Sequence, residues 1–328
     1  MKRTLYGTTY GGVAVNDTAE AAVIAEELRK SYRDKEALDG FDLLVRPGTV
    51  HGLLGPNGAG KTTAVRILTT LLRADSGHAR VAGLDVRRHS REVKRQIGLV
   101  GQQTAVDEAL SGRQNLEMFG RLFHLGVSRA RSRATGLLDQ FGLGDTGNKP
   151  VKQYSGGMRR RLDLAASLIL RPAVLFLDEP TTGLDPHGRA EIWSMVRDLV
   201  AAGTTVLLTT QYLDEADQLA DRISVLRAGR VIAEGAPDEL KSRLRADRID
   251  VVLRDGEQLA EAARLLGAQE LDADSRRLSL PAPEGIDTLL RVATRLADGG
   301  IKTEDVGLRR PTLDEVFLRL TEQKEVAA

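Results

Sequence analysis

The sequence predicts an α/β protein with a mostly parallel core sheet, followed by a small α+β domain near the C-terminus. Three strand-like runs indicate the core sheet, at residues 49–54, 173–177 and 204–209. Because these runs do not alternate between polar and apolar residues, they are typical of strands buried on both faces of a parallel sheet. The first run leads directly into a glycine-rich loop, and the pattern of polar and apolar residues changes after about Arg245.

Composition limits the class of protein. The chain has 328 residues, of which 41% are hydrophobic, enough for one large domain and a smaller one. The 47 Lys and Arg residues balance 46 Asp and Glu residues, with a formal net charge of +1. This balance argues against binding to nucleic acid through bulk charge. There are no cysteines, which excludes disulfides, thiolate metal sites and a cysteine nucleophile.

The remaining elements follow along the chain. We expect residues 1–22, rich in Gly, Thr and Ala, to be a flexible extension without the apolar core of a signal peptide. No run of 18 or more predominantly apolar residues occurs, so any membrane pore would come from a second polypeptide. Apolar residues at three- and four-residue spacing predict helices between about 104 and 170, for example Leu116, Phe119, Leu122 and Phe123.

The C-terminal part predicts a second, smaller domain. A strand at 249–253 precedes a helix at 259–266, a strand at 278–280 and a helix that begins near Ile286. This order predicts a βαβαβ-like appendage. We therefore expect a main domain at 23–242, an accessory domain at 246–323 and a short tail at 324–328.

A phosphate-binding loop is the strongest single motif. The pattern GxxxxGK[ST] lets backbone N–H groups surround a polyanion at the start of a helix. Its Lys reaches the β- and γ-phosphates of a nucleotide, and its Thr hydroxyl is offered to Mg²⁺. The loop consists of Gly55, Pro56, Asn57, Gly58, Ala59, Gly60, Lys61 and Thr62, and we expect the next residue, Thr63, to contact the nucleotide as well.

An acidic pair supplies the second half of the predicted site. Asp178 and Glu179 follow the apolar run at 173–177. A parallel strand delivers these residues to the same sheet edge as the phosphate loop, where Asp178 can hold Mg²⁺ and Glu179 can act as general base on a water. Such a pair alone is often a solvated strand end, but its occurrence with the phosphate loop favours a catalytic role.

Residues 154–158, Tyr-Ser-Gly-Gly-Met, resemble the LSGGQ signature of ABC ATPases. Ser155, Gly156 and Gly157 form an expected anion nest ahead of a helix that begins near Met158. A lone Ser-Gly-Gly is usually a turn, but here it precedes the acidic pair as in that family. The resemblance implies that this nest contacts ATP bound to an opposite subunit, so that two copies of the chain enclose two nucleotides.

Other motifs fit the same family in order. The resemblance covers about residues 23–242 and implies a P-loop NTPase of ABC type, with an N-terminal antiparallel β subdomain and a helical subdomain. It implies that Tyr32 stacks on adenine, although an isolated Tyr is more often core or surface. It implies that Gln102, after the strand at 97–100, senses Mg²⁺ and the membrane partner, and that Asp185 bridges the subunits.

One position departs from the family pattern. The resemblance places a switch residue, normally His, where this sequence has Gln211. An amide can still donate a hydrogen bond to a γ-phosphate, but it does not titrate near neutral pH. This departure puts the rate of hydrolysis in question rather than ATP binding. The rival interpretation is that Gln211 only ends a strand and that Glu179 carries hydrolysis alone.

The C-terminal segment 309–321 resembles that of daunorubicin-resistance-type drug exporter ATPases, as does the Gln at the switch position. Thr312 and Glu315 form an expected capping box. The helix that follows has an apolar face, which either packs on its own domain or contributes to subunit assembly. That face comprises Leu313, Val316, Phe317 and Leu320.

The resemblance implies an ATP- and Mg²⁺-dependent exporter motor that forms a homodimer and binds a separate multi-spanning permease. It would lie at the cytoplasmic face of a bacterial membrane, and Arg far outnumbers Lys, which suits a GC-rich bacterium. An importer motor is the first alternative. A nucleic-acid machine of ABC type is the second, but the tandem motors, long coiled coil or basic stripe of that class are not visible in the sequence.

Overall fold

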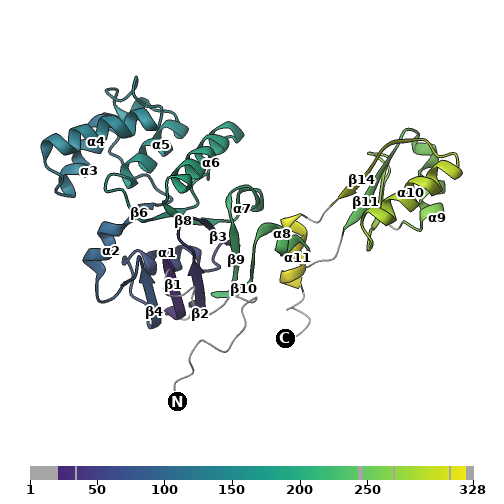
Figure 1. Ribbon diagram of the computed structural model, residues 1–328, viewed down its shortest axis with the longest axis horizontal. Coiled ribbons are helices and arrows are strands. Elements are labelled where there is room, and N and C mark those ends of the chain that lie inside the picture. The colour runs from purple at the N-terminus through teal and green to yellow at the C-terminus, as the bar shows by residue number, and fades with distance from the viewer. Residues whose placement is uncertain (1–20, 34, 243–246, 269, 310–311, 323–328) are drawn as a thin grey trace, which may run out of the picture. The chain divides into compact units, whose positions relative to one another are not determined.

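The computed structural model describes residues 21–33, 35–242, 247–268, 270–309 and 312–322 (Figure 1). It separates into two compact units, Met1–Glu234 and Gly235–Ala328. The division falls earlier than the end of the predicted main domain at residue 242, because helix α8 (Pro237–Ser242) packs against helix α11 (Leu313–Glu322) of the second unit. The predicted extension at 1–22, apart from its last two residues, and the tail at 324–328 lie outside the described residues.

A six-stranded sheet forms the centre of the first unit. In the spatial order given below, the second to the sixth strands all run parallel to one another. This arrangement confirms the predicted core sheet. The three predicted core strands are buried at every residue, as expected for runs that do not alternate between polar and apolar residues. In spatial order the strands are β10 (Arg230–Gly235), β9 (Arg222–Arg227), β3 (Val50–Leu54), β8 (Thr205–Thr210), β7 (Val174–Asp178) and β6 (Ile97–Val100).

A four-stranded antiparallel sheet packs against one face of this core, as expected. Phe41, Ile67 and Phe176 belong to one apolar cluster, which joins the antiparallel sheet, helix α1 (Lys61–Leu68) and the six-stranded sheet. The antiparallel strands, in spatial order, are β2 (Lys35–Val45), β1 (Val23–Tyr32), β4 (Ser76–Val81) and β5 (Leu84–Asp85).

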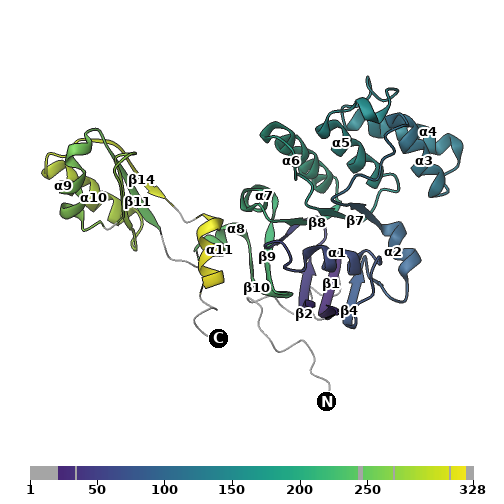
Figure 2. The same ribbon diagram turned by 180° about the vertical axis from the view of Figure 1, so that it is seen from behind.

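The predicted helical subdomain consists of three helices that lie together away from β1 and β2 in both views (Figures 1 and 2). They are α3 (Gly112–Leu122), α4 (Val127–Gln140) and α5 (Gly156–Ser167), and they share a second apolar cluster with the other face of the core sheet. Among the described residues, no helix has both the length and the apolar character needed to cross a bilayer. The other helices of this unit are α2 (Ser90–Gln96), α6 (Pro186–Ala201) and α7 (Leu213–Leu219).

The second unit contains a four-stranded antiparallel sheet in spatial order β12-β13-β11-β14, with the chain order βαββαβ. The predicted order βαβαβ was therefore wrong by one strand. The missed strand has three residues, all exposed, so its sequence carries no apolar alternation. The elements are β11 (Arg248–Leu253), α9 (Leu259–Leu266), β12 (Glu270–Asp272), β13 (Arg277–Pro281), α10 (Ile286–Asp298) and β14 (Thr303–Arg309).

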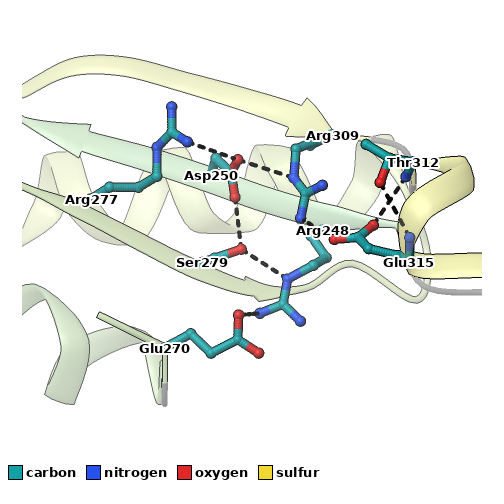
Figure 3. Close-up of polar contacts among 8 residues, drawn as sticks. All are labelled: Arg248, Asp250, Glu270, Arg277, Ser279, Arg309, Thr312 and Glu315. Carbon is teal, nitrogen blue, oxygen red and sulfur yellow. Dashed lines mark hydrogen bonds and ion pairs between the residues drawn. The ribbon is translucent and has the colours of Figure 1, made fainter. Parts of the chain in front are cut away.

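The two faces of this sheet differ in polarity. Ile249 and Val251 point into an apolar cluster with residues of α9 and α10. Arg248 and Asp250, which alternate with them along β11, lie on the opposite face in a network of ion pairs and hydrogen bonds (Figure 3). Asp250 accepts a hydrogen bond from Ser279 at 2.7 Å and lies 3.2 Å from Arg309. The alternation of period two therefore separates a core face from a polar face.

Helix α11 begins with the predicted capping box. The Thr312 N–H donates to Glu315 Oε2 at 3.0 Å, and the Glu315 N–H donates to Thr312 Oγ1 at 3.4 Å, which confirms it (Figure 3). Leu313 and Val316 are buried by the chain itself, and α11 contacts α8. The burial of these two residues fits the alternative in which the face packs on its own domain, and the role in subunit assembly stays a prediction. The side chain of Leu320 lies outside the described residues.

Candidate active site

The predicted nucleotide motifs follow four neighbouring parallel strands. The phosphate loop follows β3, Gln102 follows β6, Glu179 follows β7 and Gln211 follows β8. Since the carboxyl ends of parallel strands share one edge of the sheet, all four motifs open on the same side. The Gly55 N–H donates to the carbonyl oxygen of Thr210 at 3.3 Å, which ties the phosphate loop to the end of β8.

The backbone of the phosphate loop packs directly against the backbone of neighbouring segments. A Cβ added at Gly55 would lie 2.4 Å from the carbonyl oxygen of Leu226, and one added at Gly60 would lie 2.4 Å from that of Ala37. Gly60 also has φ +112°, a conformation that favours glycine. The tip of the loop, Pro56 to Gly58, is exposed. Neighbouring backbone thus supports the two ends of the loop, and the exposed tip of the loop is available to a ligand.

Lys61 opens helix α1 and is 4% exposed. Its Nζ donates to the carbonyl oxygens of Gly55 at 2.7 Å and Pro56 at 3.2 Å, and lies 3.3 Å from Glu179 Oε1. A buried ammonium group needs such partners. Its charge is balanced by a single carboxylate within 4 Å among the described residues, so a polyanion bound in the loop would find a positive charge already in place. Thr63 is partly exposed in the first turn of the same helix.

Asp178 is buried at the end of β7. Its Oδ1 accepts a hydrogen bond from Thr209 Oγ1 at 2.6 Å and a long one from Thr62 Oγ1 at 3.4 Å. No cluster of three or more His, Cys, Asp or Glu side chains that could enclose a metal occurs among the described residues. Mg²⁺ usually takes one or two protein oxygens and completes its shell with phosphates and water. The Thr62 hydroxyl and the Asp178 carboxylate therefore fit Mg²⁺ that arrives with a nucleotide.

Glu179 adopts a backbone conformation that is uncommon for a residue with a side chain, with φ +51°. Its N–H donates to both the carbonyl oxygen and Oγ1 of Thr209, each at 3.1 Å. These bonds tie Glu179, which follows β7, to the end of β8, and its carboxylate lies 3.3 Å from Lys61 Nζ. A carboxylate in this place can accept a proton from a water that attacks the phosphate held by Lys61.

Gln211, at the predicted switch position, is partly exposed directly after β8. The neighbouring backbone is fixed, since the Tyr212 N–H donates to Thr210 Oγ1 at 2.9 Å. The Arg189 guanidinium carbon lies 4.8 Å from the centre of the Tyr212 ring. Gln211 is thus presented at the nucleotide edge by a well-supported turn.

A buried acid beside the site was missed by the sequence analysis. Glu215 of α7 is 1% exposed and accepts hydrogen bonds from Thr181 Oγ1 at 2.8 Å and Trp193 Nε1 at 3.2 Å. Burial raises the pKa of its carboxyl group, against the lowering effect of these hydrogen bonds. Glu215 thereby ties the helix after Gln211 to the loop after Glu179. A Glu in the first turn of a helix is usually exposed, so its burial could not be predicted from the sequence.

The signature residues face outward. Ser155 is the N-cap of α5, and its Oγ accepts from the Met158 N–H at 3.2 Å, so the helix begins at Gly156 rather than near Met158. The Ser155 O–H remains free to donate. Neither Gly156 nor Gly157 has a positive φ, and a Cβ added at either would meet no atom within 4 Å. Packing among the described residues therefore does not explain these glycines, and the predicted contact with a nucleotide stays a prediction.

Two other predicted contacts are exposed. Tyr32 is 44% exposed at the end of β1 and pairs across the hairpin with Lys35. A Cβ added at Gly58 would lie 3.4 Å from Lys35 Nζ, so this hairpin borders the phosphate loop. Gln102 is exposed after β6. Both side chains are exposed, and their contacts with a nucleotide stay predictions.

Asp185 is exposed and already has a partner. Its Oδ1 accepts from the Gly188 N–H at 2.8 Å as the N-cap of α6. One chain by itself contains no second subunit, so the predicted bridge between subunits stays a prediction.

Comparisons with known proteins agree with this geometry. Residues 38–182 match the family model described as ABC transporter. The chain is 63% identical to the daunorubicin resistance ATP-binding protein DrrA3 of Streptomyces coeruleorubidus, over 92% of this chain and 96% of that protein. It is 50% identical to the daunorubicin/doxorubicin resistance ATP-binding protein DrrA of Streptomyces peucetius, over 94% of each chain. Among solved structures, the ATP-binding cassette MJ0796, a dimer in a post-hydrolysis state with ADP and Pi, aligns with a TM-score of 0.59 and 26% identity over 65% of this chain and 98% of that one.

Proposed function

The chain belongs to the ABC transporter family of ATP-binding proteins, and from this premise we propose that it is the ATPase motor of a bacterial drug exporter. Two copies would enclose two ATP molecules and drive a separate membrane permease. The observation that carries the proposal is the full-length similarity to proteins named for daunorubicin resistance. The placement of Glu179 beside Lys61 at 3.3 Å supports active hydrolysis.

In this proposal, some of the residues bind ATP and Mg²⁺, and others carry out the hydrolysis. The backbone of the phosphate loop and Lys61 hold the β- and γ-phosphates, and Tyr32 stacks on the adenine. Thr62 and Asp178 would hold Mg²⁺, and Gln102 would sense it. When bound, ATP supplies the phosphoryl group and Mg²⁺ neutralises its charge. Glu179 takes the proton of the attacking water, and Gln211 donates a hydrogen bond to the γ-phosphate.

The second nucleotide contact comes from the partner copy in this proposal. Ser155, Gly156 and Gly157 lie on the surface with open space before them. A phosphate carried by a second subunit would fill this space, and the N-terminal end of α5 would favour its negative charge. The dimer of the similar cassette supports this arrangement. Asp185 then lies near the subunit boundary.

The permease is the third component. No described helix is suited to cross a membrane, and the similar proteins are named as ATP-binding proteins of drug resistance. We place the motor at the cytoplasmic face of the membrane, where ATP is available, with the permease docked beside Gln102. Purification of the tagged chain from its native membranes should recover a multi-spanning protein as a stoichiometric partner.

The direct test of the chemistry is Glu179→Gln. The amide cannot accept the proton, so turnover should fall about 10²–10⁴-fold. ATP affinity should be kept or slightly increased, because Lys61 loses the carboxylate at 3.3 Å that competes with phosphate. Size-exclusion chromatography with ATP and Mg²⁺ should then show a stable dimer, and steady-state ATPase assays should show the lost turnover.

Glu261→Gln serves as the control, because this exposed residue of α9 lies in the other unit. It should hydrolyse ATP at the wild-type rate and form no trapped dimer. Hydrolysis by Glu179→Gln at the wild-type rate would contradict the assignment of the base. Drug export is tested separately, by the accumulation of daunorubicin in cells that carry the permease with the wild-type or the Glu179→Gln chain.

A further inference from the structure

Arg160 of the signature helix α5 joins three elements of the active site. Its side chain is buried, with 7% of the residue exposed. The guanidinium donates to the carbonyl oxygen of Pro180 at 2.6 Å, to that of Glu179 at 3.2 Å and to that of Gly101 at 2.7 Å. One side chain therefore holds both the backbone of the catalytic glutamate and the residue before Gln102.

Asp163, one turn further along α5, strengthens the second of these links. Its Oδ1 accepts from the Ala105 N–H at 3.0 Å, and its Oδ2 lies 3.5 Å from Arg160 Nη1. Asp163 is 4% exposed, so this ion pair is inside the protein. The loop that carries Gln102 is thus bonded to α5 on both sides of that residue, at Gly101 and at Ala105.

The same helix begins at the signature. Ser155 caps α5, and Arg160 lies little more than one turn after it. In the proposed dimer, the nucleotide that contacts Ser155 belongs to the partner copy. Glu179 and Gln102, in contrast, act on the nucleotide bound to their own chain. Helix α5 therefore contacts one ATP site at its start and is hydrogen-bonded to the other through Arg160.

We infer that Arg160 is a positioning residue that couples the two ATP sites of the dimer. A nucleotide of the partner subunit that binds Ser155 fixes the start of α5. The hydrogen bonds of Arg160 then fix the backbone of Glu179 and the loop that carries Gln102. Each chain then reaches its hydrolytic geometry only when both sites hold ATP. The inference rests on the proposed ATP-enclosing dimer.

The chemistry of the side chain explains why arginine is needed. Its planar guanidinium has five N–H donors in fixed directions, whereas an ammonium group is a compact point charge. Lysine can keep the charge beside Asp163 but cannot bond three carbonyl oxygens that belong to two different loops. Arg161 provides the contrast within the same helix, because its hydrogen bond goes to Phe141 at 3.5 Å and its ion pair to Glu191 at 3.9 Å.

The strained backbone of Glu179 makes these bonds important. A residue other than glycine at φ +51° persists only when its surroundings hold it. Arg160 supplies the hydrogen bonds to the carbonyl oxygens of this residue and of Pro180. Without them, we expect the carboxylate to leave its place near Lys61 in a fraction of the molecules, even though the loop and Lys61 are unchanged.

The test compares Arg160→Lys with the wild type in ATPase assays over a range of ATP concentrations. Two coupled sites give a Hill coefficient between 1 and 2. We expect the variant to lose about tenfold to a hundredfold in kcat, and its Hill coefficient to fall to 1. The affinity of the isolated monomer for ATP should stay as in the wild type, because Arg160 does not touch the phosphate loop.

Two further variants keep the test decisive. Arg161→Gln, on the same helix, should retain the wild-type Hill coefficient. If Arg160→Lys folds poorly, Arg160→Gln combined with Asp163→Asn removes both buried charges together and should show the same loss of cooperativity. Thermal unfolding of each variant reports whether it is folded.

The outcomes separate this inference from the proposed function. A folded Arg160 variant that keeps the wild-type Hill coefficient overturns the coupling, whether or not its kcat has fallen, while the ATPase and dimer remain intact. A wild-type chain that neither hydrolyses ATP nor dimerises with it overturns the proposed function itself, and the coupling with it. Loss of cooperativity in both Arg160 variants but not in Arg161→Gln supports the coupling.

Discussion

Thr209 offers a sharp test of how the active site is held together. Its hydroxyl lies between the two acids, donating to Asp178 at 2.6 Å and accepting from the Glu179 N–H at 3.1 Å. Thr209 is fully buried. Replacement by Val keeps the shape of the side chain and removes only the hydroxyl, so the Asp178 carboxylate loses its shortest hydrogen bond.

The size of the effect follows from these two bonds. A hydrogen bond to a charged group contributes about 1.5–3 kcal/mol, and a neutral one about 0.5–1.5 kcal/mol. Thr209→Val should therefore lower the free energy of unfolding by about 2–4.5 kcal/mol. Thr205 on the same strand gives the matched control, since its Oγ1 accepts one bond, from the Gly48 N–H at 3.0 Å. Thr205→Val should lose only about 0.5–1.5 kcal/mol.

Urea denaturation and ATPase assays over a range of Mg²⁺ concentrations distinguish the two variants. Because Asp178 is the predicted Mg²⁺ ligand, Thr209→Val should need more Mg²⁺ for half-maximal activity and should turn over more slowly. Thr205→Val should behave like the wild type in both respects. If Thr209→Val hydrolysed ATP with wild-type rate and Mg²⁺ dependence, the Thr209 hydroxyl would have no part in orienting the acids, and the reasoning would fail.

Two further predictions concern pH and the switch. Burial lowers the pKa of His51 to about 3, below its value of about 6.5 in the unfolded chain. The free energy of unfolding should therefore be highest above about pH 6.5 and should be about 2 kcal/mol lower at pH 5. Urea denaturation above about pH 6.5 and at pH 5 should show this loss, and the same loss in His51→Gln would contradict the prediction. Gln211→Ala should cut turnover about tenfold to a hundredfold and spare ADP binding, whereas Gln211→His should stay active with a new ionisation between about pH 6 and 7. Unchanged turnover in Gln211→Ala across pH would show that this position is no switch.

The sequence was most informative where chemistry requires a fixed residue type at a fixed spacing. The phosphate loop follows the strand-like run at 49–54 and the acidic pair follows the apolar run at 173–177, so their strands and the shared edge could be predicted together. The capping box of Thr312 and Glu315 was predictable for the same reason, because its spacing reflects a local hydrogen-bond pattern. Strand β12 was not, since its three exposed residues have no apolar period.

The supporting residues could not be recognised in the same way. Arg160 is the middle of three consecutive arginines, and the rotation of the helix alone decides which of them is buried. A weak signal exists, because Arg160 and Asp163 stand at i and i+3 among the buried residues of α5. Glu215 is likewise one of two neighbouring acids at the start of α7, and only the structure shows that it is the buried one. Tertiary context determines both.

The positive φ of Glu179 explains why these supporting residues are needed. A residue followed by proline is already restricted, and Glu179 precedes Pro180 in a left-handed conformation that costs roughly 1–3 kcal/mol. Thr209 holds its N–H and Arg160 holds its carbonyl oxygen, while Glu215 holds Thr181 two residues later. These three contacts come from β8, α5 and α7, so the proposed general base keeps its place only while the elements around it keep theirs. Because α5 begins at the signature and α7 follows Gln211, a movement at either proposed phosphate contact would act on the backbone of Glu179 itself.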